Sequence, residues 1–159
     1  MNTTYLLLGS NMGDSRQQLK VAIKHIRAAV GKVKRQSRLY VTAAWGNTSQ
    51  PDFLNQVIVV ETKLDAAVTM QAVLAIEAAM GRVRTVKNAP RVIDIDILFF
   101  NKEIIKTIDL TIPHPEIQNR RFVLVPMNEL SPMFRHPVLQ QNIHQLLLHC
   151  ADTLNVKKF

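Results

Sequence analysis

The order in which strand-like and helix-like segments follow one another is the strongest constraint on how this chain can fold. Residues 4–8 contain an unbroken apolar run, Tyr5 to Leu8, before turn residues, which is typical of a buried strand. Apolar residues then recur at helical spacing over residues 15–30, and Asp14 or Ser15 can cap this helix. Segments 33–41 and 53–61 are alternating or β-branched, so we expect two further strands there.

A second helix and a fourth strand follow in the same manner. Asp65 can cap a helix that extends to about Met80, and Gly81 occupies the position just after it where helices commonly end. Residues 92–100 are apolar and β-branched enough to predict a strand. One side of the second helix is expected to contain Met70, Val73, Leu74, Glu77 and Met80.

The resulting order is strand, helix, strand, strand, helix, strand. This is the order of the ferredoxin-like βαββαβ unit, an α+β fold in which both helices pack on one face of an antiparallel sheet. We also expect a short return strand at 103–106 and, after residue 113, short helices that include one at 143–150. Because chains of about 100–200 residues usually form one domain, residues 1–159 are expected to be a single domain. The fold hosts many unrelated activities and does not by itself indicate a function.

The charge of the chain narrows the kinds of partner to consider. The sequence has 20 Lys and Arg against 12 Asp and Glu, a formal net charge of +8. Such a balance suits nucleic acid, an anionic membrane surface or a small polyanion such as a nucleotide. Four of the cations share one face of the first helix, which we interpret as solvated surface: Arg16, Lys20, Lys24 and Arg27.

Other features of the composition bear on the compartment. No apolar run approaches the roughly 18 residues of a membrane span, and we find no secretory signal. The single Cys150 cannot form an intramolecular disulfide, which fits a reducing compartment. We therefore expect a soluble, cytoplasmic monomer that binds neither membrane nor nucleic acid.

The segment most informative about chemistry is the acidic pair Asp94 and Asp96. Residues i and i+2 of a strand point to the same face, about 6.5–7 Å apart at Cα. Their apolar neighbours predict a central strand, where two acids are costly to bury without a cation. Carboxylate oxygens suit Mg²⁺, and a pair can serve two ions. The alternative is an edge strand whose acids face water or pair with arginines.

A cationic segment just upstream favours the metal interpretation. Arginine forks bind phosphate oxygens bidentately, while acids can hold a Mg²⁺ ion that bridges the same oxygens. The alternative is a solvated loop whose charges pair with Asp94 and Asp96. No glycine-rich phosphate-binding motif occurs, so a nucleotide would be bound by side chains and metal. The cations lie within ten acid-free residues: Arg82, Arg84, Lys87 and Arg91.

A set of short motifs in a fixed order connects these features to a known family. The motifs are Gly9-Ser10-Asn11, Tyr40-x-Thr42, Gln50-Pro51-Asp52-Phe53-Leu54-Asn55, Glu77 with Gly81-Arg82-x-Arg84, Pro90-Arg91-x-x-Asp94-x-Asp96, Pro113-His114-Pro115 and Asn119-Arg120-x-Phe122. Each is weak alone, but the ordered set, which covers residues 5 to about 130, is specific. Through it the chain resembles the 6-hydroxymethyl-7,8-dihydropterin pyrophosphokinase family of folate biosynthesis.

This resemblance implies an enzyme that transfers pyrophosphate from ATP to the hydroxymethyl group of the dihydropterin and releases AMP. It implies two Mg²⁺ ions held by Asp94 and Asp96, which with Arg82 and Arg91 form the catalytic set. It implies that the ATP-binding residues are Glu77, Arg82, Arg84, Arg91, Ile97, Thr111, His114 and Arg120. It implies a pterin site, with two phenyl rings sandwiching the heterocycle, made of Thr42, Ala43, Trp45, Phe53, Asn55 and Phe122.

The chain also departs from the family pattern. The family usually has Arg-Trp-Gly-Pro-Arg in a mobile loop, whereas residues 87–91 read Lys-Asn-Ala-Pro-Arg, one residue shorter and without the tryptophan. Ala43 replaces a common proline, Trp45 replaces an aliphatic residue, and Asp109 replaces an arginine. An impaired relative that only binds pterin or nucleotide is therefore one alternative.

A second alternative is an RNA-binding module of the RRM type on the same architecture. Such a domain would use the +8 charge, but it should carry a strand motif with alternating aromatic residues. Aromatic residues make up only 6% of this chain, and no such strand occurs. The sequence therefore favours the enzyme.

Overall fold

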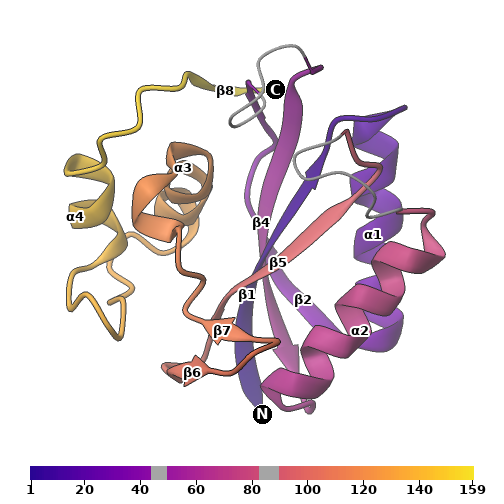
Figure 1. Ribbon diagram of the computed structural model, residues 1–159, viewed down its shortest axis with the longest axis horizontal. Helices are drawn as coiled ribbons and strands as arrows, with labels where there is room; N and C mark the ends of the chain where they lie inside the picture. The colour runs from indigo at the N-terminus through magenta and orange to yellow at the C-terminus, as the bar shows by residue number, and fades with distance from the viewer. Residues whose placement is uncertain (44–49, 83–89) are drawn as a thin grey trace.

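A twisted antiparallel sheet forms the middle layer of the molecule (Figure 1). The computed structural model describes residues 1–43, 50–82 and 90–159. The first strand, β1 (Asn2–Ser10), pairs on one side with β4 (Phe53–Thr62) and on the other with β5 (Asp94–Phe100). The prediction that the acidic strand is central is wrong, because β5 pairs with β1 alone among the described strands and lies at the sheet edge.

The expected strand at 33–41 is two strands instead of one. They are β2 (Gly31–Gln36) and β3 (Tyr40–Thr42), and both pair with β4. Ser37 causes the break, because its hydroxyl oxygen accepts a hydrogen bond from the Val57 N–H at 3.0 Å and donates to the Arg38 carbonyl at 2.7 Å. The Ser37 N–H still donates to the Val57 carbonyl at 2.9 Å, but the Ser37 hydroxyl takes the place of its carbonyl as the acceptor for the Val57 N–H. The strand order is that of the ferredoxin-like sheet.

Both predicted helices pack on one face of this sheet. In α1 (Ser15–Ala29), Asp14 accepts a hydrogen bond from the Gln17 N–H; in α2 (Ala66–Ala79), Asp65 accepts one from the Val68 N–H. Gly81 has a φ of +91°, which confirms its place after the helix. The predicted apolar side of α2 is only partly right, since Leu74 is exposed. The buried side consists of Ala66, Thr69, Val73, Ile76 and Glu77.

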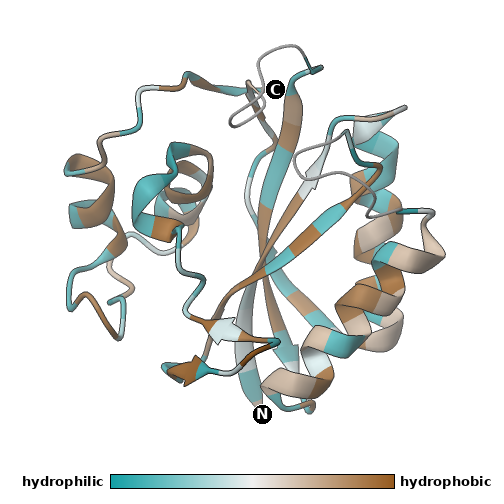
Figure 2. Ribbon diagram, in the orientation of Figure 1, coloured by the Kyte–Doolittle hydropathy of each residue, from teal (hydrophilic) through white to brown (hydrophobic). Residues whose placement is uncertain are grey.

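The C-terminal part of the chain covers the opposite face of the sheet. It contains a 3₁₀ turn (Ile117–Asn119), α3 (Arg121–Leu130) and α4 (Ile143–Leu148). The ten-residue α3 contains Pro126, and we expected only short helices in this stretch. Figure 2 shows apolar residues on these helices and on the strands. Together they form a second core, which includes Tyr5, Leu7, Val57, Phe99, Leu124 and Met127.

Three short strands complete the structure. The expected return strand is β6 (Ile105–Lys106), which pairs with β7 (Thr111–Ile112). The last strand, β8 (Val156–Lys158), pairs with β3 and was not predicted. No helix among the described residues is long and apolar enough to span a bilayer.

The helices on both faces bear on the RNA-binding alternative. An RRM domain stacks bases on the exposed face of its sheet. In this chain α1 and α2 cover one face, and α3 and α4 cover much of the other (Figure 1). The arrangement therefore leaves a pocket beside the sheet in place of an open platform for bases.

Candidate active site

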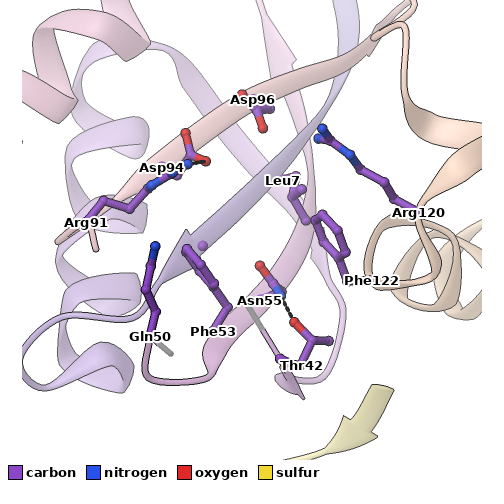
Figure 3. A pocket seen from close by; sticks show the side chains of 12 residues that line it. Leu7, Thr42, Gln50, Phe53, Asn55, Arg91, Asp94, Asp96, Arg120 and Phe122 are labelled. Atoms are coloured by element: carbon purple, nitrogen blue, oxygen red, sulfur yellow. Dashed lines mark hydrogen bonds and ion pairs between the residues drawn. The ribbon is translucent and has the colours of Figure 1, made fainter. Parts of the chain in front are cut away.

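A pocket opens where α3 leaves the end of the sheet uncovered (Figure 3). The register of β1 builds its floor, because Gly9 lies opposite Asn55 on one side and opposite Asp94 on the other. One step along the same face, Leu7 lies opposite Asp96. The complete lining is Leu7, Gly9, Thr42, Ala43, Gln50, Phe53, Asn55, Arg91, Asp94, Asp96, Arg120 and Phe122.

Gly9 keeps this floor open. A Cβ atom at this position would lie 2.9 Å from the Asn55 Oδ1 atom and 3.6 Å from the Phe53 ring. A side chain here would therefore displace the Asn55 amide, whereas its contact with the Phe53 ring would be an ordinary one. The absence of a side chain at Gly9 leaves the Asn55 amide and the Phe53 ring free to face a ligand.

Two phenylalanine rings form the walls of the pocket. Figure 3 shows Phe53 and Phe122 on either side of Asn55. Each ring has a guanidinium over it: Arg91 lies 5.5 Å from the Phe53 centroid, and Arg120 lies 5.7 Å from the Phe122 centroid. Each wall therefore joins a flat apolar surface to a cation.

The polar groups between the walls are buried and oriented. The Asn55 Nδ2 atom donates a hydrogen bond to the Thr42 hydroxyl at 2.9 Å, and both residues are buried. The Asn55 carbonyl oxygen consequently points over Gly9 toward the pocket. An acceptor oxygen and a hydroxyl proton are thus available to a ligand that carries both donors and acceptors.

A network of alternating charges surrounds Asp94. The Arg82 Nη1 atom donates to Asp94 Oδ1 at 2.6 Å and to Glu77 Oε2 at 2.9 Å, while the Arg91 Nη1 atom donates to Asp94 Oδ2 at 2.9 Å. Glu77 is buried, and its Oε2 atom also accepts the Ile95 N–H at 2.7 Å. Burial lowers the pKa of Arg82, but the attraction of Asp94 and Glu77 outweighs it and raises that pKa. The pairing of arginines with an acid, which the sequence left as an alternative, is what the ligand-free pocket shows for Asp94.

Asp96, unlike Asp94, is not paired with an arginine among the described residues. Among the described residues it forms no ion pair within 4 Å. Burial, followed by repulsion from Asp94 and Glu77, raises its pKa to about 7, against the opposing effect of Arg120 and Arg82. Ionisation of the Asp96 carboxyl group near neutral pH is therefore unfavourable, and a cation bound beside it would stabilise the ionised form.

The donor set fits a magnesium ion that shares its ligands with a phosphate. Asp94 and Asp96 face one pocket from the same side of β5. No group of three or more His, Cys, Asp or Glu residues suited to a metal occurs in the described part of the chain. Mg²⁺ commonly uses one or two carboxylates and takes its other ligands from phosphate and water.

Asn11 joins three segments around the pocket. Its backbone N–H donates to the Arg91 carbonyl at 3.2 Å, and its Oδ1 atom accepts the Arg91 N–H at 2.9 Å. Its Nδ2 atom donates to Gln50 Oε1 and to the Pro51 carbonyl. Gly9, Asn11 and Gln50 belong to the sequence motifs, but no role in the pocket was predicted for them. Gly9, Gln50 and Leu7, which is outside the motifs, line the pocket.

The remaining predicted ATP residues lie beyond the pocket. The His114 N–H donates to the Leu98 carbonyl on β5 at 3.0 Å, and its Nδ1 atom accepts the Glu116 N–H at 3.1 Å, so the neutral ring carries its proton on Nε2. Burial and then the charge of Arg120 lower the pKa of His114. Thr111 lines a second, more apolar pocket with His114.

Three predicted residues either pack away from the pocket or lie outside the described part of the chain. The Ile97 side chain packs in the core against the helices, so only its backbone can reach a ligand. Trp45 and Arg84 lie outside the described residues. The structure thus brings eleven of the predicted residues to one pocket or to the charge network: Arg82, Arg91, Asp94, Asp96, Glu77, Arg120, Thr42, Ala43, Phe53, Asn55 and Phe122.

Comparisons with known proteins give a consistent picture. Residues 5–132 match the family model described as 7,8-dihydro-6-hydroxymethylpterin-pyrophosphokinase (HPPK). A 2-amino-4-hydroxy-6-hydroxymethyldihydropteridine pyrophosphokinase of Methylorubrum extorquens is 41% identical over 133 residues, which are 83% of this chain and 84% of that protein. The Bacillus subtilis protein of the same name is 40% identical over 131 residues, 81% of this chain and 78% of its own length.

A solved structure shares the fold at lower identity. An HPPK-DHPS of Plasmodium falciparum, titled as the wild type with STZ-DHP, superposes with a TM-score of 0.76 at 19% identity and covers 92% of this chain. This chain spans only 43% of that longer one. At such identity the likeness supports the fold alone.

The raised pKa of Asp96 yields a prediction for the metal-free protein. Between pH 4 and 7 the folded chain retains a proton on Asp96 that the unfolded chain has released, so stability falls as pH rises through this window. In Asp96→Asn the site is neutral throughout. The free energy of unfolding of the variant, relative to the parent, should rise by roughly 1–3 kcal/mol between pH 4 and pH 8. Urea unfolding in EDTA measures this difference; equal values at both pH would contradict the assigned environment.

Proposed function

The chain belongs to the 7,8-dihydro-6-hydroxymethylpterin-pyrophosphokinase family, and from this we propose that it transfers pyrophosphate from ATP to 6-hydroxymethyl-7,8-dihydropterin in folate biosynthesis. The products are AMP and the pterin pyrophosphate. The observation that carries the proposal is a pocket in which two acids and two arginines lie beside a pair of phenyl rings. The acids and arginines suit the phosphate chain of ATP, and the phenyl rings suit the flat heterocycle of the pterin.

Phe53 and Phe122 are the residues for the pterin. A flat heterocycle between two rings gains stacking on both faces. The Asn55 carbonyl oxygen and the Thr42 hydroxyl, ordered by their mutual hydrogen bond, can accept from and donate to the heterocycle edge. Ala43 lines the same side of the pocket, and we assign Trp45 to this site on family resemblance.

Asp94 and Asp96 would hold two Mg²⁺ ions, which when bound would supply positive charge to the phosphate groups of ATP. The arginines that now pair with Asp94 are then available to phosphate. Arg82, Arg91 and Arg120 approach the acids from different elements, as their contacts with Asp94 and Phe122 indicate. Arg82 and Arg91 would then contact phosphate oxygens in place of Asp94, because a guanidinium group binds phosphate as well as carboxylate.

The remaining ATP residues frame this site. Glu77 holds Arg82 and the Ile95 N–H, so its role is to orient the cation. His114 is held at the outer edge of β5 and presents an Nε2 proton that can donate to a phosphate oxygen. We assign the backbone of Ile97, together with Thr111, to the nucleotide. Arg84 is assigned to the triphosphate on family resemblance.

The chemical step requires alignment more than covalent help. The pterin hydroxyl oxygen attacks the β-phosphorus of ATP, and the bond from that phosphorus to the oxygen shared with the α-phosphorus breaks. AMP leaves with that oxygen, and the hydroxyl proton passes to solvent. The residues contribute by holding hydroxyl and phosphorus in line and by placing arginines on the phosphate oxygens. No general base is assigned.

We further propose that residues 1–159 act as a monomeric, single-domain cytoplasmic enzyme with no membrane or nucleic-acid partner. The unpaired Cys150 supports a reducing compartment.

The reaction is tested by its nucleotide product. Incubation with ATP, Mg²⁺ and 6-hydroxymethyl-7,8-dihydropterin should yield AMP in equal amount to pyrophosphorylated pterin, as measured by chromatography. Asp96→Ala should lose turnover while keeping the far-ultraviolet circular dichroism of the parent, because one of the acids for the metal is gone. Production of ADP would contradict the reaction type, and pterin or nucleotide binding without turnover would favour the impaired relative.

The aromatic walls predict a selective loss of pterin affinity. Stacking of a base on an aromatic side chain contributes about 1–3 kcal/mol, so Phe53→Ala and Phe122→Ala should each weaken pterin binding roughly 5- to 100-fold. The matched variants Phe53→Leu and Phe122→Leu keep apolar volume without a flat ring and should recover only part of the loss. Calorimetric titration with pterin and with an ATP analogue separates the two sites. Equal losses for both ligands would argue against this assignment.

A further inference from the structure

The helix that presents two pocket residues is capped by a distant side chain. The residue before α3, Arg120, makes no side-chain capping hydrogen bond. The first N–H groups of a helix have no partner within it. Here the Arg121 N–H donates to Asp152 Oδ2 at 2.9 Å, across 31 positions of sequence. The other carboxylate oxygen of Asp152 accepts the Leu154 N–H at 2.9 Å.

This cap lies between the two pocket side chains of α3. Arg120 and Phe122 flank Arg121, and both line the pocket. The Arg120 carbonyl also accepts the N–H groups of Val123 and Leu124, each at 3.1 Å. The backbone of this turn therefore sets the direction of one cation and one ring of the pocket. Movement of the turn would displace both.

The segment that carries Asp152 also reaches the side of the pocket formed by Thr42. Strand β8 pairs with β3, which places Val156 opposite Thr42 and Lys158 opposite Tyr40. The Phe159 N–H extends this pairing to the Leu39 carbonyl at 2.9 Å. In Figure 3 the strand passes near Thr42, and Figure 1 shows the chain crossing from α4 to the sheet. One segment, 152–158, thus touches the Phe122 side and the Thr42 side of the pocket.

We propose that Asp152 is a positioning residue for the pterin site, acting through the first turn of α3. The inference rests on the proposed function. The match to the family model ends at residue 132, so the segment lies beyond the region that defines the family. By its cap and its strand pairing, this segment links the turn that carries Phe122 to the strand that carries Thr42.

The test compares two helix caps. Asp152→Ala removes the cap of α3, and Asp65→Ala removes the cap of α2, which accepts the Val68 N–H at 2.9 Å far from the pocket. Loss of either cap should lower stability to a similar degree. Only Asp152→Ala should weaken pterin binding, by roughly three- to tenfold, and lower kcat/KM for the pterin by at least as much. Asp152→Asn, whose single amide oxygen can accept the Arg121 N–H but not the Leu154 N–H as well, should recover part of the affinity.

A second readout is independent of ligand. Amide hydrogen exchange of residues 121–124 should accelerate in Asp152→Ala and stay at the parent rate in Asp65→Ala. Equal pterin affinities for the parent and Asp152→Ala, or equal losses in both variants, would overturn the proposal. If the parent protein neither binds nor converts the pterin, the proposed function fails instead, and the exchange measurement still decides whether Asp152 fixes the turn.

Discussion

The arrangement of charge on β5 is the constraint on which the rest of the site depends. Asp94 already holds two guanidinium groups, whereas Asp96, one step along the same face, has a pKa raised to about 7 by burial and by its acidic neighbours. Two carboxylates in this setting favour a ligand that brings cations with it. The arginines that pair with Asp94 are also suited to phosphate, so the pocket contains the groups that the proposed reaction needs.

The position of these acids follows from strand pairing. Because β1 pairs with β4 and β5 at once, one row across the sheet contains Asn55, Gly9 and Asp94. The groups proposed for the pterin edge and the acids proposed to hold metal are thereby set side by side on a rigid element, and the missing side chain at Gly9 leaves space between them. Glu77 reaches the same region from α2, where it fixes Arg82 against β5. A sheet thus supplies the alignment that phosphoryl transfer requires.

Much of this could be predicted from local pattern. Helix caps at Asp14 and Asp65, the face shared by the two acids, and the family resemblance are confirmed. The edge location of β5 was not predictable, since apolar composition does not distinguish a central strand from an edge strand covered by other elements. The break at Ser37 and the cap from Asp152 depend on side-chain contacts over 20 and 31 positions, which periodicity cannot reveal.

The exchange of partners at Asp94 is the central claim, and a crystal structure with Mg²⁺, a non-hydrolysable ATP analogue and the pterin tests it most directly. We expect oxygen–metal distances of about 2.0–2.1 Å from both Asp94 and Asp96. Arg91, now 2.9 Å from Asp94, should have moved to a phosphate oxygen. A complex in which Arg82 and Arg91 keep their bonds to Asp94 while the metal is held by phosphate and water alone would contradict the account.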